Sequence, residues 1–130
     1  MPNTVLLIDD ETRIRTLLAR LLNHGMQMEV LEAENGKEGL KILDRHKNID
    51  LIIVDIFMPD MDGLEFIRSV RKFDKDIKIL AITGGGTGTS QDFLAHAKAM
   101  GATDTLHKPL ELESLTAIVG KLLQEGQEEN

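Results

Sequence analysis

The chain has 130 residues, 42% of them hydrophobic, with 15 basic and 22 acidic side chains that give a formal net charge of −7. This length is typical of one domain that buries a hydrophobic core, and the negative charge argues against direct binding of nucleic acid or of an acidic membrane surface. There is no cysteine, so disulfides, thiolate nucleophiles and zinc–thiolate sites are excluded. The sequence has no signal peptide pattern and no apolar run of membrane-spanning length, so we expect a cytoplasmic protein.

The first part of the chain alternates short apolar runs with helical spacing. Residues 5–8 and residues 28–33 predict two strands. Between them, apolar side chains at i, i+3, i+4, i+7 and i+8 predict an amphipathic helix ended by Gly25, and they are Ile14, Leu17, Leu18, Leu21 and Leu22. Asn35 and Glu38 have the spacing of a capping box, which predicts a helix to about Lys47.

The middle of the chain repeats this alternation. Residues 51–54 predict a third strand and residues 77–82 a fourth. Asp62 and Glu65 have the spacing of a capping box and predict the start of a helix between these two strands. The side chains of this helix expected to point inward are Leu64, Ile67 and Val70.

The last part begins after a glycine-rich stretch. We expect a helix from Ser90 to Met100 that Gly101 ends. Residues 103–107 predict a fifth strand, which is less apolar and is therefore expected at an edge of the sheet. A final helix carries Leu112, Leu115, Val119, Leu122 and Leu123, and a polar tail follows from Gly126.

Five strands that alternate with five helices predict an α/β fold with a parallel sheet covered on both faces. We assign residues 1–126 to one domain and residues 127–130 to a polar C-terminal tail. In the flavodoxin-like, doubly wound strand order 2-1-3-4-5, strands one and three lie side by side at the switch point where ligands bind.

Four charged residues stand at the ends of the predicted strands. Asp9 and Asp10 follow the first strand, Asp55 follows the third, and Lys108 follows the fifth. Three neighbouring carboxylates repel one another unless a cation lies among them, and one lysine balances only one negative charge. The pattern therefore predicts a divalent metal ion and an anionic substrate at this edge of the sheet.

Several of these residues also have ordinary structural interpretations. Asp9 or Asp10 can cap the following helix, and Thr83 can be a β-branched strand residue. Proline after Lys108 favours a sharp turn, which would also aim the lysine. The stretch Gly84-Gly85-Gly86-Thr87-Gly88-Thr89 lacks the Gly-Lys-Ser/Thr ending of a nucleotide-binding P-loop.

Residues from Val5 to about Leu123 resemble the receiver domain of two-component response regulators, of the stand-alone, single-domain type. The resemblance rests on motifs in a fixed order: Asp9-Asp10, Asp55 followed by Met58-Pro59 and Asp62-Gly63, Thr83 at the end of the fourth strand, and Lys108-Pro109 after the fifth.

The resemblance implies a role for each of these residues. Asp55 would accept a phosphoryl group from a phosphohistidine of a histidine kinase or a histidine phosphotransfer protein. Asp9, Asp10 and Asp55 would hold Mg²⁺ together with the backbone carbonyl of Phe57.

The same resemblance implies how phosphorylation is sensed. Lys108 would bind one phosphoryl oxygen and the Thr83 hydroxyl another. The surface of the fourth helix, fifth strand and fifth helix would then change shape and alter the affinity for a downstream protein.

Three features of the sequence depart from this pattern or add to it. The position three before the lysine is commonly aromatic in the family and is Thr105 here. The glycine-rich stretch 84–89 is long, and we predict that it is mobile without phosphate and partly ordered with it. Phe57 is large enough to shield an acyl phosphate from water.

Three other functions compete with that of a terminal signalling switch. A metal-dependent phosphatase resembling haloacid dehalogenases would need an aspartate two residues after the nucleophile, where this chain has Phe57. A receiver-like module that is never phosphorylated is disfavoured, because every residue that the resemblance assigns to phosphorylation and metal binding is present. An intermediate of a phosphorelay, which passes its phosphoryl group to another protein, is not distinguished from a terminal switch.

Overall fold

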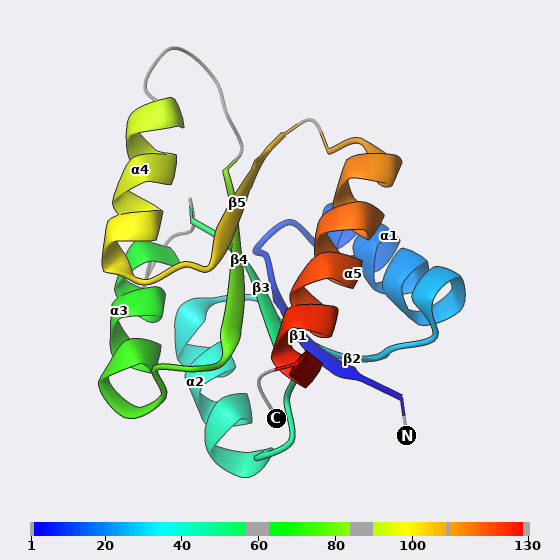
Figure 1. The fold of residues 1–130 in the computed structure, drawn as a ribbon, viewed down its shortest axis with the longest axis horizontal. Helices are drawn as coiled ribbons and strands as arrows, with labels where there is room; N and C mark the ends of the chain where they lie inside the picture. The colour runs from blue at the N-terminus through cyan, green and yellow to red at the C-terminus, as the bar shows by residue number, and fades with distance from the viewer. Residues whose placement is uncertain (1, 57–62, 84–89, 109, 129–130) are drawn as a thin grey trace.

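The computed structural model describes residues 2–56, 63–83, 90–108 and 110–128. These residues form a parallel sheet of five strands in the order β2-β1-β3-β4-β5, which confirms the predicted order (Figure 1). The strands are β1 (Thr4–Ile8), β2 (Glu29–Ala33), β3 (Leu51–Asp55), β4 (Lys78–Thr83) and β5 (Asp104–His107). The helices are α1 (Thr12–Arg20), which continues as a π-helical turn (Leu21–Gly25), α2 (Gly36–Arg45), α3 (Gly63–Phe73), α4 (Ser90–Met100) and α5 (Leu112–Glu128).

The central strands are apolar because helices cover both faces of the sheet. Every residue of β1 and of β3 is buried. At the edge, β5 is only half-buried along most of its length, as its less apolar sequence predicted. The alternating strands and helices therefore make a three-layered molecule with the sheet in the middle.

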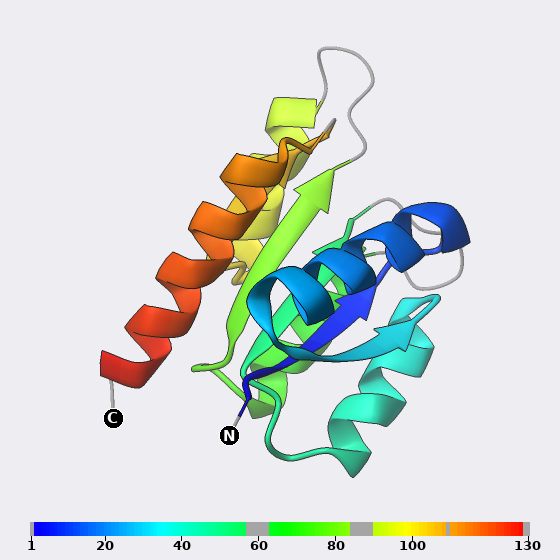
Figure 2. The ribbon, with the colours of Figure 1, turned by 90° about the vertical axis from the view of Figure 1, so that its right-hand side faces the viewer.

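The two faces of the sheet carry different helices. Figures 1 and 2 show α1 and α5 on one face and α2, α3 and α4 on the other. Alternate residues of β1 enter the two cores: Val5 and Leu7 pack beneath α1 and α5, whereas Leu6 and Ile8 pack beneath α2 and α3. Phe66, the largest of the fully buried side chains among the described residues, belongs to the second core.

Two predicted helix ends are present with their expected geometry. The Asn35 side chain accepts a hydrogen bond of 2.9 Å from the Glu38 N–H at the start of α2. After α4, Gly101 has a φ of +122° and its N–H donates to the carbonyl of Ala97 at 3.1 Å. At its other end, α2 stops at Arg45, two residues before the expected Lys47.

The last helix is longer than the sequence suggested. Its hydrogen-bonded turns continue through Gly126 to Glu128, where we had expected a polar tail. Polar Gln and Glu residues have good helix propensity, so loss of the apolar pattern does not end a helix. Of the described helices, none has the length and apolar content needed to cross a membrane.

Two leucines expected on packed helix faces are exposed instead. Leu17 of α1 is 68% exposed, and Leu112 at the start of α5 is 64% exposed. The π-helical turn after α1 was not predicted either, because apolar spacing does not distinguish i+4 from i+5 hydrogen bonds. The helix nevertheless ends at Gly25 as predicted, and Leu22 in this turn is fully buried.

Candidate functional site

The predicted acidic residues meet at the carboxyl edge of the sheet. β1 and β3 are adjacent and pair Ile8 with Val54, so Asp9 and Asp55 emerge side by side. Both are almost fully buried, at 2% and 4% exposure, whereas Asp10 is exposed. One carboxylate oxygen from each of the three lies within 4.8 Å of the others. Their predicted convergence is confirmed.

Lys108 reaches into the same cluster. Its Nζ lies 3.2 Å from Oδ2 of Asp55 and 3.5 Å from Oδ2 of Asp9, and its side chain is 13% exposed. The sheet places it there, because the Lys108 N–H donates to the carbonyl of Thr83 at 2.9 Å and so extends the pairing of β4 with β5. A lysine 53 residues from Asp55 in sequence thus becomes its direct partner.

The pKa of Lys108 reflects a contest between burial and charge. Burial is the largest single effect and lowers the pKa of this ammonium group, but the nearby carboxylates of Asp55 and Asp9 act in the opposite direction. Their combined effect prevails, so the pKa of Lys108 is raised above 10.5. Lys108 is therefore a permanent cation at neutral pH.

The donor set fits a hard divalent cation. Three carboxylates and one ammonium group leave two negative charges uncompensated, and all the candidate ligands are oxygen atoms. Mg²⁺ prefers oxygen ligands and is commonly bound through one or two carboxylates together with waters and phosphate oxygens. The fourth predicted ligand, the carbonyl of Phe57, lies outside the described residues.

Thr83 carries a buried hydroxyl group at the same edge of the sheet. It is the last residue of β4 and is fully buried. Among the described residues, its Oγ1 is a buried side-chain atom with no hydrogen-bond partner. A buried hydroxyl without a partner costs about 1–3 kcal/mol relative to a satisfied one, so a new acceptor beside it would be favourable.

Other residues singled out from the sequence are placed less fully. Thr105 is half-buried in β5 and pairs with Ala81 of β4. The glycine-rich stretch 84–89 and Pro109 lie outside the described residues, so their predicted behaviour stays a prediction.

Arg15 was not singled out from the sequence, and Gly63 was named there only as part of a motif, without its structural role. A Cβ at Gly63 would lie 2.4 Å from the carbonyl oxygen of Asp55, so only glycine fits where α3 begins. Arg15 donates a 2.7 Å hydrogen bond from Nη1 to the backbone carbonyl of Asp9. Neither follows from spacing in the sequence, because both contacts depend on how the turns after β1 and β3 fold.

The geometry agrees with the comparison to known families. The model of the response regulator receiver domain matches residues 5–120. The chain belongs to this family. Receiver domains are phosphoacceptors of two-component signalling and phosphorelays rather than conventional enzymes, and this chain is such a phosphorylation-activated signalling switch.

Individual relatives cover the receiver at different lengths. Sporulation initiation phosphotransferase F of Bacillus subtilis is 30% identical over 124 residues, which are 95% of each chain. The sensor histidine kinase CheAY of Helicobacter pylori is 36% identical, but the match covers 92% of this receiver and 15% of that protein. Several relatives are thus much longer than this chain.

Solved structures give the same fold. A response regulator receiver domain protein from Clostridium thermocellum superposes with a TM-score of 0.90 at 28% identity, covering 98% of this chain and 99% of that one. A CheY-like receiver domain protein from Methanospirillum hungatei has a TM-score of 0.89 at 25% identity, covering 100% of both chains.

Proposed function

We propose that Asp55 is the phosphoacceptor of this receiver and that its phosphoryl donor is a phosphohistidine of a histidine kinase or a histidine phosphotransfer protein. The observation that carries this proposal is the position of a nearly buried Asp55 carboxylate, 3.2 Å from the Lys108 ammonium group and within an acidic cluster. A carboxylate in this position is paired with a cation, and the remaining negative charge of the cluster favours binding of a metal ion.

The chemistry requires one bond to form and one to break. A carboxylate oxygen of Asp55 attacks phosphorus, and the electron pair of the breaking P–N bond returns to the imidazole of the donor. Lys108, already beside Asp55, pairs with an oxygen of the transferred group and offsets its charge. Mg²⁺ held by Asp9, Asp10, Asp55 and the Phe57 carbonyl would neutralise further charge on the phosphoryl oxygens.

These groups would also make the chain assist its own reactions. Positioning and charge neutralisation lower the barrier for phosphorylation, and the same arrangement serves attack by water on the acyl phosphate. We infer that Phe57 slows that attack by screening the phosphate. The Thr83 hydroxyl would donate a hydrogen bond to a phosphoryl oxygen, and the movement of Thr83 would alter the surface formed by α4, β5 and α5. A downstream protein that recognises this surface would then bind with a different affinity.

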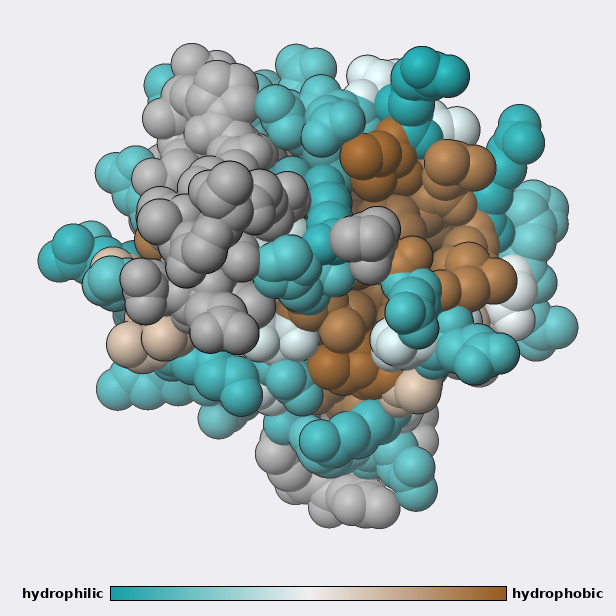
Figure 3. Space-filling view, turned by 90° about the horizontal axis from the view of Figure 1, so that it is seen from above, coloured by the Kyte–Doolittle hydropathy of each residue, from teal (hydrophilic) through white to brown (hydrophobic). Residues whose placement is uncertain are grey.

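The donor protein needs a surface around the pocket. Figure 3 shows apolar side chains gathered over α1 and α5, on the face that carries the pocket. Leu17 of α1 and Leu112 at the start of α5 are 68% and 64% exposed, and Ile14 and Leu110, near them in the sequence, are half-buried. Because the phosphohistidine must reach Asp55, its protein has to cover this rim, and we infer that it docks on these four residues, the α1–α5 surface.

Intact mass tests the proposed acceptor. Incubation with Mg²⁺ and a small-molecule phosphodonor is expected to add one phosphate to the native protein and none to Asp55→Asn, which keeps the size of the side chain. Omitting Mg²⁺ is expected to abolish the addition. Phosphate gain by Asp55→Asn at the native rate would overturn the assignment.

The relative from Bacillus subtilis favours a place within a relay. That protein is named a phosphotransferase, and its match covers 95% of both chains. If this receiver is also a relay intermediate, its purified phosphorylated form is expected to transfer the group to the histidine of a phosphotransfer protein. Loss of the phosphate only to water in such a mixture would argue for a terminal switch.

A further inference from the structure

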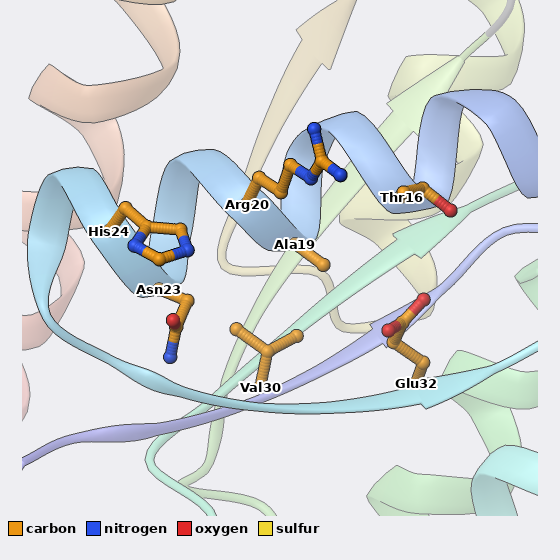
Figure 4. Close-up of a pocket in the computed structure, with 7 residues that line it drawn as sticks. All are labelled: Thr16, Ala19, Arg20, Asn23, His24, Val30 and Glu32. Atoms are coloured by element: carbon orange, nitrogen blue, oxygen red, sulfur yellow. The ribbon is translucent and has the colours of Figure 1, made fainter.

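One arginine fastens the turn that carries the acidic pair. Arg15 lies in the first turn of α1, and its side chain is 15% exposed. Its Nη1 donates to the backbone carbonyl of Asp9 at 2.7 Å, and its Nε donates to Oε1 of Glu32 at 3.1 Å. Figure 4 shows Glu32 pointing from β2 toward α1. A single planar guanidinium group thus joins the end of β1 to the neighbouring strand.

Each polar group of Asp9 has a partner. Its N–H donates to the carbonyl of Ala33 at 3.1 Å, and its carbonyl accepts from Arg15. In the carboxylate, Oδ1 accepts from the Glu11 N–H at 2.9 Å and Oδ2 from Lys108 at 3.5 Å. These contacts fix Asp9 from β2, from the residue that follows β5, and from the start of α1.

The bond from Arg15 has a consequence for the next residue. The carbonyl that it holds belongs to the peptide plane between Asp9 and Asp10, and a peptide unit rotates as a rigid plane. Fixing that carbonyl therefore restricts the backbone angles on both sides of it. Asp10 is exposed and its side chain lacks the packing that surrounds Asp9, so its direction depends on this plane.

We propose that Arg15 is a positioning residue for the divalent cation site: it fixes the peptide plane between Asp9 and Asp10, and Glu32 holds its guanidinium group in place. The inference rests on the proposed metal site and deepens it. Glu32 also balances the charge of Arg15, so the turn gains rigidity without adding a net positive charge beside a cation site.

Rigidity and charge predict opposite effects of removing Arg15. If Arg15 acted only through its charge, Arg15→Gln would remove a repulsive cation and strengthen Mg²⁺ binding. If it acts by positioning, Arg15→Gln weakens binding, by about tenfold or more for the loss of one charge-assisted hydrogen bond. Arg15→Lys keeps the charge but cannot make both hydrogen bonds with one planar group, so its affinity for Mg²⁺ should lie between those of the wild type and Arg15→Gln.

The test measures Mg²⁺ binding by the unphosphorylated protein. The chain contains no Trp or Tyr, so amide chemical shifts in ¹H–¹⁵N spectra report the titration with MgCl₂. Arg13→Gln is the matched control, because it removes the same charge from an exposed position of the same helix. Arg13→Gln should bind within about twofold of wild type. Binding by Arg15→Gln as tight as the control, or tighter, would overturn the proposal.

Two further measurements keep the result decisive. Glu32→Gln changes a half-exposed residue and should also weaken Mg²⁺ binding; unchanged binding would remove Glu32 from the proposal. In the absence of metal, the Glu11 amide should exchange about fivefold faster in Arg15→Gln than in Arg13→Gln, because its acceptor Asp9 is less fixed. Equal exchange would overturn the positioning role. Failure of the wild-type protein to bind Mg²⁺ would instead overturn the metal site of the proposed function.

Discussion

Lys108 connects the charge of the pocket to the stability of the fold. Its pKa is raised above 10.5, because the carboxylates of Asp55 and Asp9 outweigh the opposing effect of burial. A group whose pKa is higher in the folded state stabilises that state fully below its unfolded pKa. This contribution is lost as the pH rises through the folded pKa. The relevant window therefore lies above 10.5.

We expect Lys108→Met to lower the urea midpoint relative to wild type at neutral pH. It leaves Asp9 and Asp55 buried without their ammonium partner. Above pH 10.5, the two midpoints should approach one another as Lys108 of the wild type loses its proton. Urea unfolding at a series of pH values measures the difference. A gap that stays constant through the alkaline range would contradict the raised pKa.

Thr83 allows the resting and the phosphorylated states to be separated. Thr83→Val keeps the shape of the side chain and removes a buried hydroxyl that has no partner among the described residues. The unphosphorylated protein should therefore become more stable, by about 1 kcal/mol. The phosphorylated protein should lose a hydrogen bond, so the spectral change caused by phosphorylation should shrink. Urea unfolding and ¹H–¹⁵N spectra measure the two effects. Loss of stability in the resting state would indicate a partner outside the described residues.

At the scale of elements, the junction between β3 and α3 holds the acceptor. A Cβ added to Gly63 would lie 2.3 Å from the Cα of Ile56 and 2.4 Å from the carbonyl oxygen of Asp55. Both are backbone atoms, so the clash cannot be relieved by the movement of a side chain. Gly63→Ala should therefore displace the start of α3, destabilise the protein by about 1–3 kcal/mol and slow phosphorylation of Asp55.

Gly120 provides the matched control for this substitution. It lies in α5, and a Cβ there would have no heavy atom within 4 Å. Gly120→Ala should stabilise the protein by up to about 1 kcal/mol, because alanine has the higher helix propensity. Chemical denaturation and intact-mass rates compare the two variants. Equal tolerance of both substitutions would show that the junction adapts more easily than its geometry implies.

The elements themselves were largely predictable from local pattern. Asn35 and Gly101 mark helix ends by chemistry that acts within a few residues, so the sequence was sufficient to place them. The exposure of Leu17 was not predictable, because an apolar helix face says which residues can pack but not how wide a surface the sheet offers.

The candidate site divides in the same way. Asp9, Asp10, Asp55 and Lys108 were found because strand ends in a parallel sheet converge whatever the loops do. Arg15 and the structural role of Gly63 were missed because their contacts are made to backbone atoms of turns. Such contacts depend on the conformation of the turn and leave no periodic signal in the sequence.

At the scale of the whole molecule, the pocket residues lie at the carboxyl ends of the strands, and the residues of the α1–α5 surface lie in α1 and at or just before the start of α5. Pocket chemistry and partner docking can therefore be tested apart. A small phosphodonor needs only the pocket, whereas a phosphohistidine arrives on a protein that must also cover the rim.

Leu17→Ser should leave phosphorylation by a small-molecule donor unchanged and slow transfer from a histidine-phosphorylated protein about tenfold, because only the second reaction buries this side chain. Phe73→Ser is the matched control. Phe73 is 64% exposed and ends α3, which begins at the pocket edge and runs away from it. Rapid-quench measurements with both donors compare the two variants. Equal slowing of protein-mediated transfer by both would indicate a general effect of losing an exposed apolar residue, and the donor would then have to approach Asp55 from another side.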